Sequence, residues 1–561
     1  MRSLTELAFR LNQEAANLFL LARPPRLGSR LPDSPLARMP VEFQPDPDEI
    51  RDLASEIRAH RIPLLGMTID FGPEIRWRRD PLTGVETGTE YFRRIPYLDA
   101  KVAGDHKLIW ELNRHEHLAI LARAGDDDSW KECVGQLEGW LDQNPFQRGI
   151  NWASALEVAF RALAWTRIYH LAGTRMEPAF RRRFLEALNQ HALHIANNLS
   201  FYFSPNTHLL GEAVVLHAIG VLFPEFSGAS KFEKTGRDVV AKQMDRQVHN
   251  DGSYFEQSSY YHVYALDMFL FHAQLVEPSP AHREKLSRMA DFLAALLGDA
   301  ILGPDRLLPF LGDDDGGRWF HPYGPRDQFA RATLDAANAY LGRPNLPADT
   351  SILFPDAGIA VMRASGRQII FDAGPFGGAG AGHSHSDTLS LVIRASGESV
   401  LIDPGTYTYT GDPQMRDWFR SSAAHNTIQI DGLNQGEIAN PFRWKTKPGT
   451  RVIEWSTTPE CDIAEAECSY AGFVHRRRVV FEKPNRVLVS DTILGPPGEH
   501  DVLQSWHLGS INARARVQVE GAELGEGWRS SAFGEKHLGP VLTVRKRTAL
   551  PCRLAAAIHL M

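Results

Sequence analysis

The chain has 561 residues, more than one hydrophobic core usually organises, so its length predicts at least two large domains. Hydrophobic residues make up 43% and charged residues 23%, which is typical of a folded globular protein and excludes a disordered one. The 61 basic and 68 acidic residues give a net charge of −7, which argues against a nucleic-acid-binding protein. Because this overall charge does not attract anions, an anionic ligand would need a local basic pocket.

Signals of cellular compartment are few. Glu6, Arg10 and Glu14 interrupt every apolar run of the N-terminal segment, so we expect no secretory leader, and no stretch is apolar enough to predict a membrane span. As written, the sequence is expected to be cytoplasmic, and periplasmic or secreted if a leader has been removed. The four cysteines predict reduced, mostly buried thiols, with a bridge between Cys461 and Cys468 as the alternative.

In chain order, residues 1–100 predict an arm of one or two helices and irregular chain. From residue 105 to about 342, apolar residues recur at spacings of three and four, separated by short Gly-, Pro- or Asn-bearing breaks. The segments with this helical pattern are 110–124, 152–172, 181–199, 208–223, 234–248, 258–276 and 283–298. Successive antiparallel helical hairpins predict an incomplete (α/α) toroid over residues 101–345, with an α-solenoid as the alternative.

Near residue 350 the period changes to two, which predicts strands. The segments with this pattern are 351–365, 367–375, 388–396, 399–407, 426–432, 476–483 and 486–494. Turn residues at 365–367, 396–398 and 483–485 link them into hairpins. We therefore predict an antiparallel β-sandwich over residues 346–561, with residues 343–350 as the linker and an α+β multidomain fold for the chain.

The densest polar cluster lies in GAGAGHSHSDTLSLVIRASGESVLIDPG and the following SSAAHNTIQIDG. His383 and His385 have an i, i+2 spacing, so their side chains are expected on one face. His385, Asp403 and His425 could converge as two imidazoles and a carboxylate, a set that suits Zn²⁺. The alternative is that these are hydrogen-bonded loop residues at a sheet edge.

A second cluster, SPNTHLLGEA, supplies Asn206, His208 and Glu212. Asn206 stands where a helix N-cap is expected, so capping and catalysis are both open to it. His208 and Glu212 are four residues apart on one helical face, as a catalytic or an ordinary surface pair would be.

A third cluster, NDGSYFEQSSYYHVY, precedes a helix predicted to start near Ser258, and it includes Glu256, Tyr260 and Tyr261. Adjacent tyrosines point in different directions on a helix, so only one of them can face a given cavity. A fourth cluster, FLGDDDGGRWF, departs from a calcium-loop pattern, and we interpret it as a loop in which Arg318 is a candidate for contacting a substrate carboxylate.

These clusters, in this order, resemble the heparinase II/III family of polysaccharide lyases. The likeness covers roughly residues 100–480 and includes DHKLIWELNRHEHL, GINWASALEVAFR, SPNTHLLGEA, DGSYFEQSSYYH and the HSHSD…LIDPG…AAHNT series. The resemblance implies a helical toroid, a β-sandwich and a structural Zn²⁺ on His385, Asp403 and His425, with Ca²⁺ as the alternative ion. It implies an anionic, uronate-containing polysaccharide as substrate.

The resemblance also implies roles for single residues. Tyr261, with Tyr260 as the rival, matches the catalytic tyrosine; Asn206, then His208, matches the group that neutralises the substrate carboxylate; and His383 matches a catalytic histidine. The remaining candidate substrate contacts are Asn151, Trp152, Glu212, Glu256, Arg318 and Arg420.

In β-elimination a base removes the C5 proton of a uronic acid, an acid protonates the departing 4-linked oxygen, and a donor stabilises the enolate. Tyrosine can be both acid and base if nearby cations lower its ordinary pKa of about 10. We expect Tyr261 to be the acid, and the base for one C5 epimer, with His383 the base for the other. A hydrolase using Glu212 and Glu256, or a non-catalytic polysaccharide-binding protein, are the alternatives. The lyase hypothesis requires Asn206, Tyr261 and His383 to meet one sugar.

Overall fold

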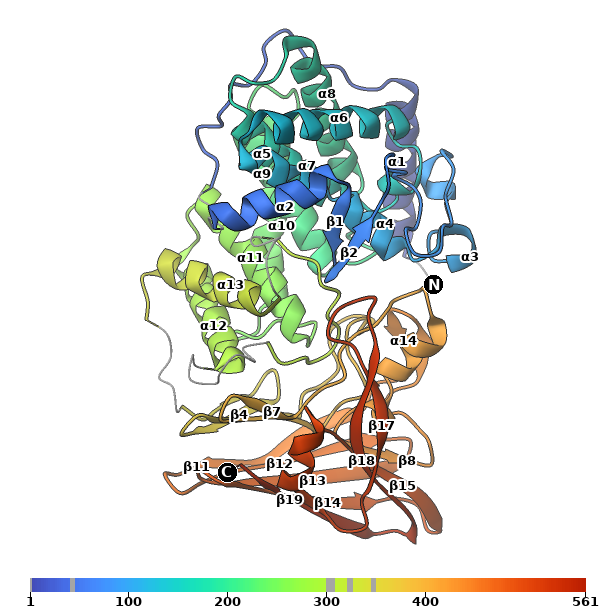
Figure 1. Cartoon of the computed structure of the whole chain (residues 1–561), viewed down its shortest axis with the longest axis vertical. Coiled ribbons are helices and arrows are strands. Elements are labelled where there is room, and N and C mark those ends of the chain that lie inside the picture. The colour runs from blue at the N-terminus through green and yellow to red at the C-terminus, as the bar shows by residue number, and fades with distance from the viewer. Residues whose placement is uncertain (1–2, 41–45, 299–307, 320–325, 345–349, 561) are drawn as a thin grey trace. The chain divides into compact units, whose positions relative to one another are not determined.

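The computed structural model describes residues 3–40, 46–298, 308–319, 326–344 and 350–560 (Figure 1). The chain divides into two compact units. The first consists of Met1–Asp245, Asp267–Ser279 and Trp319–Gly324, and the second of Arg246–Leu266, Pro280–Arg318 and Pro325–Met561.

The first unit is mainly helical. Its helices are α1 (Leu4–Ala22), α2 (Pro47–Arg58), α3 (Ala100–Ala103), α4 (His106–Leu112), α5 (Glu116–Ala124), α6 (Asp127–Gln143), α7 (Ala155–Ala172), α8 (Pro178–Asn197), α9 (Thr207–Leu222) and α10 (Ala229–Gln247). One hairpin, β1 (Arg61–Leu64) and β2 (Met67–Asp70), and the short 3₁₀ helices η1 (Phe92–Arg94) and η2 (Ile150–Trp152) complete it. Helix α11 (Ser259–Leu275) begins in the second unit and ends in the first.

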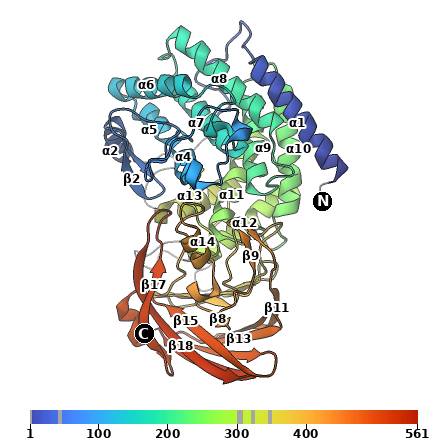
Figure 2. The same cartoon turned by 90° about the vertical axis from the view of Figure 1, so that its right-hand side faces the viewer.

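Burial separates inner from outer helices. Almost every residue of α7 and α9 is buried. Helix α9 is apolar on nearly all sides, whereas α7 also buries the charged residues Glu157, Arg161 and Arg167. Helix α7 contacts α5, α8 and α9, while α1 lies along the amphipathic α8 (Figure 2). At Gly220 of α9 a Cβ would lie 2.3 Å from the backbone nitrogen of Glu233, so glycine lets α9 and α10 approach closely.

The second unit combines helices α12 (Pro280–Leu297) and α13 (Arg326–Leu341) with the strands that follow residue 350. The strands before residue 445 are β3 (Ile352–Phe354), β4 (Ile359–Ala364), β5 (Arg367–Asp372), β6 (Ser390–Ala395), β7 (Glu398–Leu401), β8 (Ile428–Ile430), β9 (Ile438–Asn440) and β10 (Arg443–Trp444), with α14 (Pro413–Phe419) between β7 and β8. The later strands are β11 (Gly449–Thr457), β12 (Cys461–Tyr470), β13 (Phe473–Glu482), β14 (Arg486–Leu494), β15 (Glu499–His507), β16 (Val517–Val519), β17 (Glu523–Arg529), β18 (His537–Ala549) and β19 (Cys552–His559).

These strands form antiparallel sheets that share a core. Strands β3 to β7 make one sheet in chain order, β17-β18-β15-β8 a second, and β11-β12-β13-β14-β19-β16 a third. Alternate residues of β12 and β13 are buried, as expected where one face of a sheet packs and the other meets solvent. Apolar side chains from all three sheets belong to one buried cluster, and the predicted β-sandwich is confirmed.

The predicted change from helices to strands near residue 350 is also confirmed, while most of the predicted linker, 343–350, lies outside the described residues. Two predicted hairpin turns have left-handed backbone at both central residues, Ser365–Gly366 and Ser396–Gly397, as tight two-residue turns require. All four cysteines are free, and the alternative bridge between Cys461 and Cys468 is not formed. Among the described helices, none combines the length and the apolar character that a membrane crossing requires.

Candidate active site

Two loops of the second unit bring an acidic and a histidine-bearing segment together. The amide of Asp313 donates a 2.8 Å hydrogen bond to the carbonyl oxygen of His383. Gly312, at φ +64°, makes this approach feasible, because a Cβ there would lie 2.5 Å from the same oxygen. The acidic run predicted to be a loop is therefore anchored directly on the HSHSD segment.

The carboxylate of Asp313 is the centre of a buried polar network. Its Oδ2 lies 3.1 Å from Nδ1 of His383, its Oδ1 lies 2.9 Å from Nε2 of His385, and the guanidinium of Arg416 donates to Oδ2 at 2.8 Å. The Asp313 side chain is fully buried and that of Arg416 is 1% exposed. Burial opposes ionisation, but the charge of Arg416 and the histidine hydrogen bonds hold the pKa of Asp313 well below its usual range.

Tyr261 stacks on His383. The two rings are 3.8 Å apart at their centroids and 21° from parallel. The Tyr261 hydroxyl lies 3.1 Å from the Tyr409 hydroxyl and donates to a carboxylate oxygen of Asp315 at 3.2 Å. Burial, and next the carboxylate of Asp315, raise the pKa of Tyr261 well above its ordinary value. This is the reverse of the lowering by cations that we expected, and it keeps the hydroxyl protonated.

Tyr260, the rival of Tyr261, has a different environment. Its ring is fully buried and packs against the rings of Tyr264 and Phe329. The two adjacent tyrosines thus point in different directions, as helical geometry predicts, and Tyr261 is the one that contacts His383.

The three predicted metal ligands do converge. His385, Asp403 and His425 each offer a ligand atom, and these atoms all lie within 4.8 Å of one another. Nδ1 of His385 and Nε2 of His425 are buried and have no hydrogen-bond partner among the described residues. Burial also raises the pKa of the neighbouring Asp387 and, with Asp387 beside it, that of Asp372. Open imidazole nitrogens amid crowded buried carboxylates fit a divalent cation, and the nitrogen and oxygen donors fit zinc.

The SPNTHLLGEA residues lie at the start of α9 in the first unit. Asn206 is the N-cap, and its Oδ1 accepts a 3.1 Å hydrogen bond from the backbone nitrogen of His208. This cap uses the oxygen of the amide, whereas carboxylate recognition would use its nitrogen. Glu212 is fully buried and accepts hydrogen bonds from the backbone nitrogen and hydroxyl of Ser200, and burial raises the pKa of Glu212 to about 8. Glu212 thereby anchors the loop that leads to Asn206.

The other predicted substrate contacts have varied surroundings. Asn151 and Trp152 are buried in the first unit, where the Asn151 amide donates to the Trp77 carbonyl. Arg420 is fully buried and pairs with Asp417 at 2.6 Å. For these three, a role in substrate binding stays a prediction.

Glu256 and Arg318 belong to the second unit. A carboxylate oxygen of Glu256 lies 3.7 Å from Nε2 of His383, too far for a hydrogen bond. The Arg318 guanidinium lies over the ring of Phe329, 5.4 Å from its centroid. Their predicted contacts with substrate are likewise untested.

Four residues of the network had no role predicted from the sequence: Asp313, Asp315, Arg416 and Tyr409. All three aspartates of the run are buried, and the sequence gives no sign that Asp313 is the one that contacts both histidines. Arg416 and Tyr409 stand outside every motif. The one available signal was that buried histidines require partners for their ring nitrogens.

A helical toroid, an antiparallel sandwich and a buried His–Asp–His set define the class of fold and site. A family model described as heparinase II/III N-terminus matches residues 59–314, and one described as heparinase II/III-like, C-terminal matches residues 347–550. The chain therefore belongs to the heparinase II/III family.

The individual relatives have low sequence identity to this chain. The chain is 25% identical over 517 residues to a heparin-sulfate lyase of Pedobacter heparinus, covering 86% of this chain and 72% of the relative. It is 25% identical over 439 residues to a heparin-sulfate lyase of Bacteroides stercoris, covering 70% of this chain but only 62% of the relative. A solved heparinase III structure aligns with a TM-score of 0.72 at 17% identity, covering 98% of this chain and 89% of that one, which shows a shared fold.

Proposed function

We propose that this chain is a polysaccharide lyase that cleaves a uronic-acid-containing polysaccharide, of the glycosaminoglycan class, by β-elimination. The heparin-sulfate lyases among its relatives support the substrate class. The observation that carries the proposal is the stacked pair of Tyr261 and His383, whose ring centroids are 3.8 Å apart. Such a pair holds an acid and a base within reach of one sugar ring.

The protonated hydroxyl of Tyr261 suits the role of acid toward the departing 4-linked oxygen. Because its pKa is raised, it is a poor base before substrate binds, and the proton at C5 goes to His383 instead. The carboxylate of Asp313 next to Nδ1 of His383 favours the tautomer that carries its proton there. Nε2 of His383 is then the atom that accepts the C5 proton.

The negative charge that develops on the substrate carboxylate needs a donor. In this proposal the amide nitrogen of Asn206 supplies it, assisted by His208 or Arg318. Glu212 contributes indirectly, since it fixes the loop that precedes Asn206.

His385, Asp403 and His425 would hold Zn²⁺, with Ca²⁺ as the alternative. Bound there, the ion supplies a cross-link between the loops that carry these three residues. The proton transfers themselves belong to Tyr261 and His383.

The test is an ultraviolet absorbance assay on heparan sulfate, alginate and other uronate polymers, because elimination creates a C4–C5 double bond conjugated to the carboxylate. We expect rising absorbance with at least one polymer, near-complete loss in Tyr261→Phe, and retention in the matched control Tyr260→Phe. New reducing ends without absorbance would instead indicate a hydrolase. Binding without either product, or full activity in Tyr261→Phe, would reject the proposal.

A further inference from the structure

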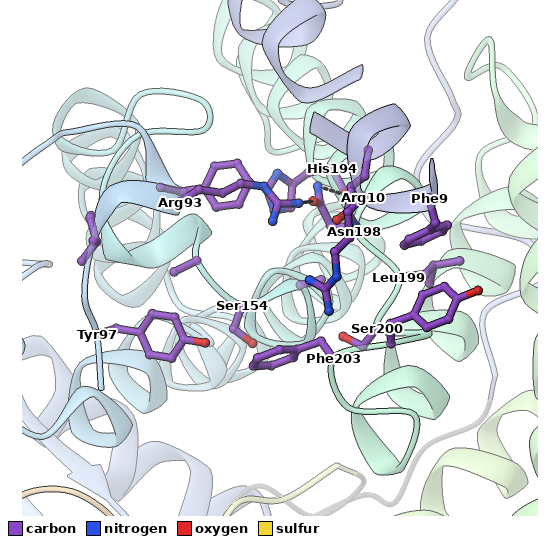
Figure 3. Close-up of a pocket in the computed structure, with 16 residues that line it drawn as sticks. Phe9, Arg10, Arg93, Tyr97, Ser154, His194, Asn198, Leu199, Ser200 and Phe203 are labelled. Carbon is purple, nitrogen blue, oxygen red and sulfur yellow. Dashed lines mark hydrogen bonds between the residues drawn. The ribbon is translucent and has the colours of Figure 1, made fainter. Parts of the chain in front are cut away.

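The first unit contains a hollow of about 200 Å³, and none of the proposed catalytic residues or metal ligands lines it (Figure 3). Helix α1 supplies Phe9 and Arg10 to its wall, the loop before α9 supplies Ser200 and Phe203, and the start of α7 supplies Ser154. Segments far apart in the sequence therefore build a single concave surface.

The lining of this hollow contains guanidinium groups. It includes the two arginines Arg10 and Arg93, and no aspartate or glutamate is found among the described residues that line it. Figure 3 shows the Arg10 guanidinium pointing into the hollow, while its Nε pairs with Glu6 at 2.8 Å, which fixes its direction. Arg93 donates to Oδ1 of Asn198 at 2.9 Å on the wall, and its Nε pairs with Glu14 at 2.8 Å. Both arginines thus have a glutamate partner outside the lining, and each ion pair engages the Nε, so the described lining of the hollow offers guanidinium donors and no carboxylate, as binding of a sulfate or carboxylate group requires.

Two further features suit an anionic sugar. Ser154 is the N-cap of the 18-residue α7 but makes no side-chain capping hydrogen bond, so the positive end of this helix faces the hollow without a side-chain cap. The rings of Tyr97 and Phe203 border the hollow in Figure 3, and Phe203 remains 61% exposed. An exposed ring next to a cation can stack on the apolar face of a sugar while the guanidinium binds its acidic group.

We propose that this hollow is a subsite for a carboxylated or sulfated sugar of the polysaccharide chain, next to the sugar that Asn206 is proposed to contact. The inference rests on the proposed lyase function, since Phe203 stands three residues before Asn206 on one loop. Arg10 is its main anchor. Arg10 precedes residues 59–314, which the N-terminal family model matches, so the subsite is built partly by this chain's own first helix.

The test compares Arg10→Gln with the matched control Arg183→Gln, an exposed arginine of α8 that also pairs with one carboxylate. Binding of heparan sulfate oligosaccharides of increasing length is measured by calorimetry in the Tyr261→Phe background, and KM and kcat are measured with Tyr261 intact. For long chains we expect Arg10→Gln to raise Kd and KM about tenfold, as loss of one charge-assisted hydrogen bond does, with kcat unchanged. The effect should disappear with the shortest oligosaccharides and fade at high salt.

The outcomes separate this inference from the proposed function. Unchanged Kd and KM in Arg10→Gln, or equal losses in Arg183→Gln, overturn the subsite while leaving the lyase activity in place. If no polymer is cleaved, the lyase proposal fails, and the calorimetric comparison still decides whether the hollow binds anionic chains. Arg10→Lys is the control for misfolding of α1. Because this variant keeps the positive charge, it should retain most of the binding. Weak binding by Arg10→Lys at normal thermal stability would also count against the subsite.

Discussion

Replacing Asp313 with asparagine should damage both stability and catalysis. The substitution keeps the shape of the side chain but removes the charge that faces Arg416, and an amide offers one acceptor oxygen where the carboxylate offers two. His383 and His385 each use a different carboxylate oxygen, so one of them must lose its hydrogen-bond acceptor. The guanidinium of Arg416 meanwhile stays buried without its counter-charge.

The size of each effect follows from these contacts. Breaking a buried ion pair by removing one partner costs about 3–5 kcal/mol in the free energy of unfolding. Losing the carboxylate that orients a metal-binding histidine typically lowers metal affinity or activity by about 10–100-fold. We therefore expect Asp313→Asn to show both losses in the second unit.

A matched control exists in the same unit. Asp491 is also buried, and it also accepts hydrogen bonds from an arginine, Arg477 at 2.7 Å, and a histidine, His475 at 2.7 Å. Asp491→Asn should therefore cost about the same stability, about 3–5 kcal/mol, but leave kcat and zinc affinity unchanged in the folded protein.

Urea unfolding gives the stability of each variant, and competition with a chelator gives the zinc affinity, independently of any activity. If Asp313→Asn and Asp491→Asn lower kcat and zinc affinity equally, the loss reflects general destabilisation and the role given to Asp313 is wrong. If Asp313→Asn binds zinc and turns over normally, the network has no part in orienting the two histidines.

Two more predictions follow from buried groups. Burial raises the pKa of Glu212 to about 8 in the folded protein, above the ordinary value of 4.5 in the unfolded chain. The preference of Glu212 for its protonated form therefore stabilises the fold at low pH, and this contribution is lost as the pH rises toward 8. Urea unfolding should show that the free energy of unfolding of Glu212→Gln rises relative to that of the unmodified chain by about 1.4 kcal/mol per pH unit over this range. A difference between the two free energies that does not change with pH would contradict the argument. Elemental analysis should find that His385→Ala and His425→Ala lose zinc while His383→Ala retains it, and equal retention in all three would remove the proposed metal site.

The secondary structure was predictable because its signals are local. The helical spacing of residues 110–298, the alternation after residue 350 and the Ser–Gly turns follow from nearest-neighbour geometry, so the two kinds of fold could be identified from the sequence. Asn206 was likewise placed at a helix start because capping residues act within three positions of each other. The domain boundaries at residues 100 and 345 remain a prediction.

The network around Asp313 could not be predicted, since it depends on contacts between residues about 70 to 100 positions apart. The direction of the Tyr261 pKa was missed for the same reason. Burial is the largest cause of the raised pKa of Tyr261, and the carboxylate of Asp315 adds to it. Arg416, the nearby cation, is engaged by Asp313. Which charge prevails at a buried group is decided by pairing among its neighbours, and sequence spacing does not encode that.

The same network bears on how a structural ion could influence an elimination reaction. Oδ2 of Asp313 holds His383, and Oδ1 of the same carboxylate holds His385, so the proposed base and a proposed metal ligand share one rigid support. An ion on His385 would therefore restrain His383 without touching the substrate. The ring of Tyr261 stacks on that of His383, so its position depends on His383. Disorder at the metal site would therefore displace both proposed proton-transfer groups, His383 and Tyr261.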